Sequence, residues 1–479
     1  MTIYLPKTVV SVDEQALITR LCEQLDAKKY RNRLRASYYD GKHAVAAVGT
    51  IIPPAYIRMA TTLGWSAQAV DALALRCNLE RFVWPDGDLD SLGAQQVWDE
   101  NYFASQANAA IISSVLHGIS FLVNTEGDAG EPDSLIHVKD ACNATGDWNE
   151  RTHRLDNLLS VHSRDESEQP DAFTLYLDGE TVTAEVVDGK WVVDRFTHPW
   201  GMPAEALIYK PRVDRPFGSS RLSRAVMSMH DRAVRVCVRM EGNADVYSFP
   251  QMILLGADNN VFKNADGSLK PSWQVALGRI FALPDDDVQE NPRASVQQFQ
   301  AASPQPHIDM FKQIAQTFSG ETKIPLADLG VADMANPTSA ESYVAARESL
   351  VATAEGATDD WAPAFRRTMV RALAIFNGEK TVPDAWLSID AKWRSPLHLS
   401  RAAQADAGLK QLTAVPWLAD TSVGLELLGL SEQQIARAMS EKRRAVGRTV
   451  LETLAQRVAA QPPPPPQPAE LINAAAAAG

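Results

Sequence analysis

The stretch AFTLYLDGETVTAEVVDGKWVVDRF (residues 172–196) decides the fold class of this 479-residue chain. Apolar and polar residues alternate in three runs, which Asp178-Gly179 and Asp188-Gly189 separate. Alternation is typical of half-buried strands, and Asp-Gly between two alternating runs is a strong hairpin signal. The stretch therefore predicts an antiparallel meander, inside a region of period two that covers residues 135–198.

Helices are predicted before this sheet. Ser11 and Glu14 form a capping box, and apolar residues at helical spacing carry a helix towards Leu34, until Gly41 of YYDGKH (residues 38–43) ends it. Ser66 is a candidate cap for a second helix. Residues 92–117 are predicted to be helical and residues 119–123 to form a strand. Helices followed by strands indicate an α+β fold.

The chain becomes helical again after the sheet, from Gly218. Apolar residues from Leu222 to Met240 lie on one face of this helix, and arginines lie beside them within roughly 80° of one another. The arginines of this stripe are Arg221, Arg224, Arg232, Arg235 and Arg239. Two interpretations stay open. The stripe is a solvated face that pairs with acids of a neighbouring helix or subunit, or it contacts a polyanion or another protein's acidic surface.

The second half of the chain predicts two short strands and several helices. Strands are expected at residues 249–257 and 279–284, the second followed by Asp285–Asp287. Pro306 opens a helix that Gly320 ends. Asn336-Pro337-Thr338-Ser339 then starts a long helix to Phe376, in which Pro363 predicts a bend at residues 358–363. Helices follow at 400–412 and 431–459, before a low-complexity proline- and alanine-rich tail, residues 461–479.

Composition limits the possible functions. The chain has 59 acidic and 46 basic residues and a formal net charge of −13, which argues against gripping nucleic acid across its whole surface. Local contact with DNA, or DNA that slides past, remains compatible with this charge. The four cysteines show no C-x-x-C spacing, and the N-terminus has no signal-peptide pattern, so we expect reduced, structural thiols in a cytoplasmic setting. No apolar run is long enough for a membrane span.

Catalytic chemistry is not indicated. The sequence holds no P-loop, no H-E-x-x-H, no G-x-S-x-G and no G-x-G-x-x-G motif. The nine histidines are interpreted as solvated surface residues. Asp285–Asp287 could hold a divalent cation, but a solvated strand end is the favoured interpretation. We therefore expect no catalytic residues, no cofactor and no metal.

Four stretches resemble the SPP1-like portal proteins of tailed bacteriophages, in the same order along the chain. They are YYDGKH (38–43), GWSAQAVDALALRCNLERF (64–82), PRVDRPFGSSRLSRAV (211–226) and NPTSAESYVAARESL (336–350). The resemblance implies a homo-oligomeric ring, usually of twelve subunits, at one capsid vertex. The resemblance further implies that double-stranded DNA passes through this ring. The implied partners are the large terminase subunit, the major capsid and scaffolding proteins and the head–tail adaptors, and the implied location is the virion, after assembly in the host cytoplasm.

The resemblance also implies a portal-type division of the chain, with a wing, a two-helix stem, a clip, a tunnel loop, a long bent helix and a helical crown. The corresponding parts are the wing at 1–217, the first stem helix at 218–248, the clip at 249–304, the second stem helix at 305–322, the tunnel loop at 323–339, the long bent helix at 340–377, wing completion and crown at 378–460, and a disordered tail at 461–479. In this scheme Asp333, Met334, Asn336 and Thr338 come nearest to DNA in the channel.

Two alternatives remain. One is a capsid-associated, metal-dependent nucleic-acid-processing enzyme that uses Asp285–Asp287. The other is a head–tail adaptor or minor head protein, although such proteins are usually shorter and lack the stem–clip–stem order.

Overall fold

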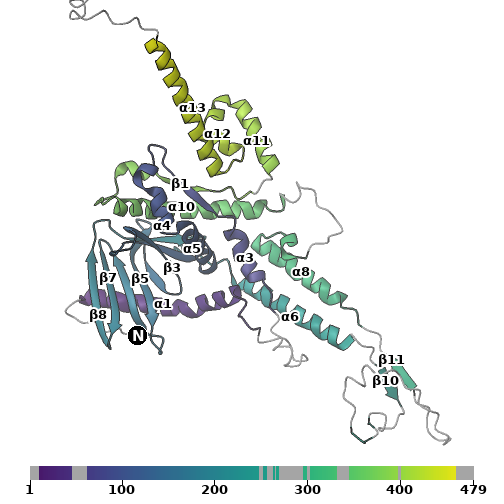
Figure 1. The fold of residues 1–479 in the computed structure, drawn as a ribbon. Helices are drawn as coiled ribbons and strands as arrows, with labels where there is room; N and C mark the ends of the chain where they lie inside the picture. Colours follow the sequence, from purple (N-terminus) through teal and green to yellow (C-terminus); the bar gives the residue numbers. More distant parts are fainter. Residues whose placement is uncertain are drawn as a thin grey trace, which may run out of the picture. The chain divides into compact units, whose positions relative to one another are not determined.

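The computed structural model describes residues 10–45, 62–247, 252–255, 263–264, 266–268, 295–298, 302–331, 345–397 and 401–459. Residues 1–396 form one compact unit and residues 397–479 a second. The first unit combines helices with four sheets, whose strand orders are β3-β2-β9, β4-β5-β6-β7-β8, β1-β12 and β10-β11. The predicted mixed fold of helices and sheets is confirmed (Figure 1).

The largest sheet contains the meander. Its strands are β4 (Ala144–Asn149), β5 (Arg154–Arg164), β6 (Pro170–Leu177), β7 (Glu180–Val187) and β8 (Lys190–Thr197). All neighbours are antiparallel, with Leu175 opposite Val182 and Ala184 opposite Val193. Gly179 and Gly189 have φ of 73° and 72°, the left-handed conformation that makes glycine the favoured residue in such tight turns. The two predicted Asp-Gly hairpins are confirmed.

Helix α1 (Val12–Tyr39) packs along this sheet (Figure 1). Its capping box is present, since Ser11 Oγ accepts from Glu14 N and Glu14 Oε2 accepts from Ser11 N. Ile18, Leu21 and Leu25 are buried against apolar residues of β5, β6 and β7. Burying three such side chains contributes roughly 1.5–3 kcal/mol each. The helix ends before Gly41 (φ 67°), as the sequence predicted.

Strand β2 (Ile119–Glu126) lies between β3 (Ser134–Asp140) and β9 (Ala204–Ile208) and is buried on both faces. Phe121 and Val123 join a core shared with β4, β5 and β9, while Leu122 points into the main core. The main core is formed chiefly by helices α3 (Trp65–Ala74), α5 (Phe103–His117), α6 (Arg224–Tyr247), α8 (Gln305–Thr322) and α10 (Glu348–Phe376).

One local prediction before β2 is wrong, and another needs refinement. Gly64 precedes α3, and Ser66 lies inside the helix, buried, so it is no cap. Most of residues 92–117 is helical, as predicted, but the segment is divided into η1 (Asp90–Leu92), α4 (Ala94–Glu100) and α5. Gly93 (φ 70°) separates η1 from α4, and Tyr102 (φ 48°) separates α4 from α5. The interruption lets buried Asn101 donate to Ser134 O and accept from Ile136 N, which joins the helices to β3.

Helices α6 and α8 pack against each other (Figure 1). The predicted apolar face of α6 is confirmed, since Val226, Met229, Ala233 and Val236 are buried. Helix α8 begins beside Pro306 as expected but continues through Gly320, and Lys323 (φ 60°) follows its last residue. Between the two helices, β10 (Met252–Leu255) pairs with β11 (Ser295–Gln298). The strand expected at 279–284 and Asp285–Asp287 lie outside the described residues.

Helix α10 is continuous through Pro363, and the predicted bend stays a prediction. The first unit also contains β1 (Leu79–Val83), which pairs with β12 (Asp390–Trp393), and the short helices η3 (Leu326–Leu329) and η4 (Asp384–Ser388). The second unit contains α11 (Arg401–Ala414), η5 (Pro416–Asp420), α12 (Ser422–Leu427) and α13 (Glu432–Ala459). The helices predicted at 400–412 and 431–459 are therefore confirmed. The tail at 461–479 lies outside the described residues.

Candidate stem and DNA-channel site

The arginine stripe on α6 consists of four residues rather than five. Arg224, Arg232 and Arg239 are exposed and Arg235 is half-buried. In the parts of the chain that the structure describes, no carboxylate lies within ion-pair distance of any of them. A row of uncompensated guanidinium groups on one helix face suits contact with an anionic surface.

Arg221 was predicted to belong to this stripe, and that prediction is wrong. Residues 218–223 are not helical. They instead run alongside the C-terminal end of α5 and the residue that follows β9, to which their backbone is hydrogen-bonded. Gly218 (φ 66°) permits this path, since a Cβ at this position would lie 2.3 Å from Tyr209 O. Ser219 N donates to Tyr209 O at 2.9 Å and Arg221 N to Val115 O at 3.0 Å.

Buried Arg221 instead links three parts of the fold. Its guanidinium donates to Ala69 O in α3, to Thr322 O at the end of α8, and to Tyr209 Oη at 3.2 Å. Carbonyl groups at a helix C-terminus carry partial negative charge, so a cation is stabilised there. Arg221 thus anchors the base of the α6–α8 pair to the rest of the first unit.

The YYDGKH motif provides a second anchor for α6. Tyr38 Oη donates to both carboxylate oxygens of Asp231 at 2.8 and 3.0 Å, and the Tyr38 ring stacks on His43 at 4.0 Å. The neighbouring tyrosine, Tyr39, donates to Asp71 of α3 at 2.8 Å. The residue of α6 next to Asp231, His230, shares a hydrogen bond of 2.9 Å between its Nδ1 and Ser66 Oγ. The paired tyrosines therefore hold two helices at once, a role that the sequence analysis did not identify.

Two histidines contradict the surface interpretation. His230 is 4% exposed and His198 is 7% exposed. Burial is the main cause that lowers the pKa of each imidazole, which favours the neutral form. The four cysteines are free, as expected, and burial raises the pKa of Cys22 to about 11 and that of Cys77 to about 12. These two thiols are protonated packing residues.

The long helix α10 is fixed by a buried charge network. Glu205 of β9 accepts from Arg371 Nη2 at 2.7 Å and from Arg367 Nε at 2.8 Å. Arg371 also donates to Asn124 Oδ1 of β2, and Asn124 Nδ2 donates to Thr368 O. Every group in this network has a partner, which is the condition under which buried charges are tolerated.

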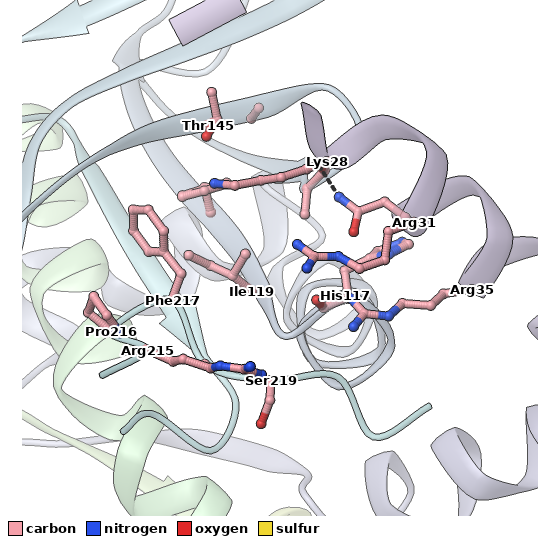
Figure 2. A pocket seen from close by; sticks show the side chains of 15 residues that line it. Lys28, Arg31, Arg35, His117, Ile119, Thr145, Arg215, Pro216, Phe217 and Ser219 are labelled. Atoms are coloured by element: carbon pink, nitrogen blue, oxygen red, sulfur yellow. Dashed lines mark hydrogen bonds between the residues drawn. The ribbon is translucent and has the colours of Figure 1, made fainter. Parts of the chain in front are cut away.

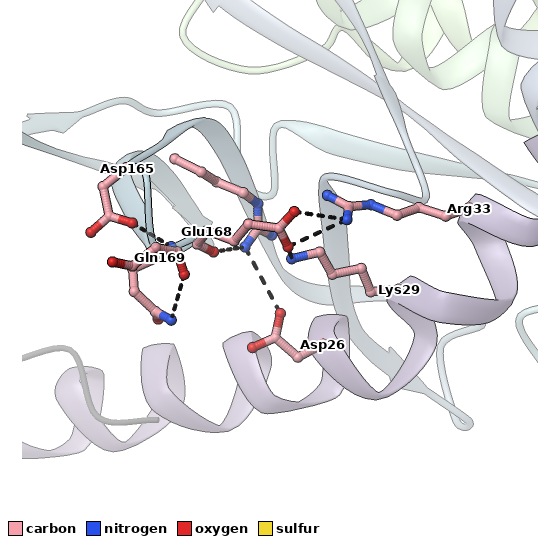
Figure 3. Close-up of polar contacts among 8 residues, drawn as sticks. Asp26, Lys29, Arg33, Asp165, Glu168 and Gln169 are labelled. Atoms are coloured by element: carbon pink, nitrogen blue, oxygen red, sulfur yellow. Dashed lines mark hydrogen bonds and ion pairs between the residues drawn. The ribbon is translucent and has the colours of Figure 1, made fainter.

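A surface cluster links α1 to the turn between β5 and β6 (Figure 3). Glu168, in the turn between β5 and β6, accepts from Lys29 and from Arg33 Nη1, the latter at 2.9 Å. Hydrogen bonds from Lys29 and Arg33 lower the pKa of the Glu168 carboxyl to about 2. These two cations of α1 are therefore neutralised within the chain.

The residues predicted to approach DNA, Asp333, Met334, Asn336 and Thr338, lie outside the described residues. Within the described ranges, no group of three or more His, Cys, Asp or Glu residues could hold a metal ion. A search of the same residues finds no helix with the length and apolarity of a membrane span.

The fold is thus a mixed helix-and-sheet body that carries an anchored pair of helices with a cationic face. A family model described as "Phage portal protein, SPP1 Gp6-like" matches residues 19–447. The chain belongs to this family of phage portal proteins.

Two relatives that are themselves portal proteins agree with this result. The chain is 26% identical over 383 residues to the portal protein of Mycobacterium phage L5, covering 78% of this chain and 77% of the relative. It is 25% identical over 419 residues to the portal protein of Mycobacterium phage D29, covering 86% and 84%. Among solved structures, it is similar to a chain of the virion of the native gene transfer agent particle, with a TM-score of 0.41 and 16% identity, covering 77% of this chain and 90% of that one.

Proposed function

We propose that copies of this chain assemble into a ring at one capsid vertex and that double-stranded DNA passes through the ring during packaging and ejection. The observation that carries the proposal is the family match over residues 19–447, which includes both anchored helices and α10. In this proposal the large terminase subunit docks on the ring first, and head–tail adaptors bind it later. The ring acts by geometry and assembly, without catalysis, after assembly in the host cytoplasm.

The charge of the chain supports a conduit that does not retain DNA. Each phosphate that a protein neutralises releases counterions and adds affinity, so a strongly cationic channel would slow the passage of DNA. The formal net charge of −13 keeps such contacts weak. The four-arginine stripe on α6 is then better suited to an acidic surface of capsid protein, scaffolding protein or a neighbouring subunit than to the DNA itself.

We assign the DNA-proximal position to the segment that contains Asp333, Met334, Asn336 and Thr338. This segment lies between η3 and α10 in the chain. Deletion of residues 333–336 is expected to leave rings intact and to impair DNA packaging or retention. Normal packaging by the deletion variant would refute this assignment.

Electron microscopy of the negatively stained, purified chain tests the proposed ring. Rings with a central hole are expected, and a compact monomer at all protein concentrations would refute the ring. The alternative, a metal-dependent nucleic-acid-processing enzyme, predicts nuclease activity that Asp286→Ala abolishes. No contact among the described residues favours that alternative.

A further inference from the structure

A cleft of about 330 Å³ lies between α1, the start of β2 and the loop that precedes α6 (Figure 2). Lys28, Arg31 and Arg35 line it from α1, and their spacing of three and four residues places them on one face of that helix. Arg215 lines it from the loop. No aspartate or glutamate is among the residues that line the cleft. Its volume falls in the range of ordinary ligand-binding pockets.

The four cations of the cleft are not neutralised within the chain. No carboxylate of the described ranges lies within ion-pair distance of Lys28, Arg31, Arg35 or Arg215, in contrast to Lys29 and Arg33 on the adjoining face, which hold Glu168. Lys28 Nζ instead lies 5.1 Å from the centre of the Phe217 ring. The cleft therefore gathers positive charge that the fold itself leaves uncompensated.

Polar atoms inside the cleft also lack partners. Arg35 Nη1 donates to His117 O at 3.0 Å, but Arg35 Nε and His117 Nδ1 are buried without a hydrogen-bond partner. Burial, and then the charge of Arg31, lowers the pKa of Arg35 to about 10. An anionic group placed in the cleft would relieve this repulsion and accept from the forked guanidinium groups.

The same unit carries an acidic feature of complementary charge. The connection between β2 and β3, residues 126–133, contains Glu126, Asp128, Glu131 and Asp133, all exposed. Glu131 Oε2 accepts from Asp128 N, and no cation of the described chain lies within ion-pair distance of the four carboxylates. We call residues 126–133 the acidic hairpin.

The acidic hairpin cannot reach the cleft of its own chain. Ile119, the first residue of β2, lines the cleft, and Glu126 is the last residue of the same strand. Seven residue steps of about 3.3 Å separate them by roughly 23 Å. The cationic cleft and the acidic hairpin thus lie at opposite ends of one strand. Two different, complementary surfaces of this kind form a head-to-tail contact between identical subunits, and such contacts close rings.

We propose that the cleft receives the acidic hairpin of a second copy of this chain, so that each subunit of a ring offers its hairpin to one neighbour and its cleft to the other. The proposal rests on the ring in the proposed function. In this contact, carboxylate groups of the hairpin bind the arginine and lysine side chains of the cleft.

Charge reversal on each side tests the proposal. Arg31→Glu with Arg215→Glu reverses two exposed cations of the cleft, and Asp128→Lys with Glu131→Lys reverses the hairpin. Each pair alone is expected to raise the protein concentration for half-assembly about tenfold or more, and the four changes together should restore assembly. Arg151→Glu with Arg154→Glu, at the exposed turn between β4 and β5, is the control of equal charge change and should assemble like the unmodified chain.

Mass photometry measures the ring fraction, and circular dichroism verifies that each variant is folded. Rings unaffected by the cleft reversal, or no recovery in the combined folded variant, would overturn the proposal while leaving the ring function intact. An unmodified chain that never forms rings overturns both. If the cleft variant loses binding to short duplex DNA but still forms rings like the unmodified chain, the cleft binds phosphodiester groups and the proposed contact is overturned.

Discussion

Glu205→Ala should be among the most destabilising single substitutions in the first unit. The Glu205 side chain is 4% exposed and holds Arg371, which is 9% exposed, and Arg367, which is 25% exposed. Removal of the carboxylate leaves Arg371 with only the Asn124 oxygen as an acceptor in the network. Breaking a buried ion pair by removing one partner costs about 3–5 kcal/mol, because the remaining charge stays buried without compensation.

Urea unfolding followed by circular dichroism, at one protein concentration for all variants, measures this loss. The matched control is Asp214→Ala, which removes the carboxylate that Arg212 contacts at 2.7 Å, with side chains 58% and 67% exposed. An exposed pair contributes less than about 1 kcal/mol. If the two variants unfold with free energies within about 1 kcal/mol of each other, Glu205 does not anchor α10 as argued.

Further predictions concern the base of the α6–α8 pair, the pH dependence of stability and the arginine stripe. Arg221→Lys keeps the charge, but its donors all sit on one nitrogen and cannot reproduce the planar fork that reaches Ala69 O, Thr322 O and Tyr209 Oη. The free energy of unfolding should therefore fall by about 2 kcal/mol in urea titrations, and an unchanged value would contradict the anchor. Burial lowers the pKa of His117 to about 4, from 6.5. The unfolded chain therefore binds the proton first as the pH falls, and up to about 3 kcal/mol of stability should be lost between pH 6.5 and pH 4. The stability of His117→Gln should lack this part of the pH dependence. If the free energy of unfolding depends on pH identically in both proteins, the assignment to His117 is refuted. Arg232→Ala with Arg235→Ala should reduce ring assembly or incorporation into capsids without a large change in unfolding free energy, and unchanged assembly and incorporation would exclude a structural role for the stripe.

The sequence predicted elements whose signals are local. The capping box of α1 and the two Asp-Gly turns depend on residues within a few positions of one another, and both are confirmed. Tyr102 carries no such signal, and its left-handed conformation accompanies hydrogen bonds of Asn101 with residues of β3 that are more than thirty positions away. Gly320 was a misleading signal, since packing of α8 on α6 carries the helix past it.

The sites were harder to predict than the elements, because their partners are distant in sequence. Arg221 looked like a surface residue by helical spacing, yet its three acceptors lie 152, 101 and 12 residues away. The role of Tyr38 likewise depends on Asp231, 193 residues further along the chain. The run Tyr38-Tyr39 did carry a signal. Two adjacent tyrosines in the last turn of a helix point in different directions, so their hydroxyl groups can donate to two different partners.

Pro363 gives α10 an uneven stiffness. Because proline has no N–H, the carbonyl of Asp359 loses the backbone donor that it would otherwise have four residues later. Asp359 is exposed, whereas Trp361 and Phe365 are buried on the core side. The helix is consequently more compliant on its solvent-exposed side, about one to two turns N-terminal to Arg367 and Arg371. A load applied through the residues before α10 would flex the helix there, and the half held by Glu205 would be spared the strain.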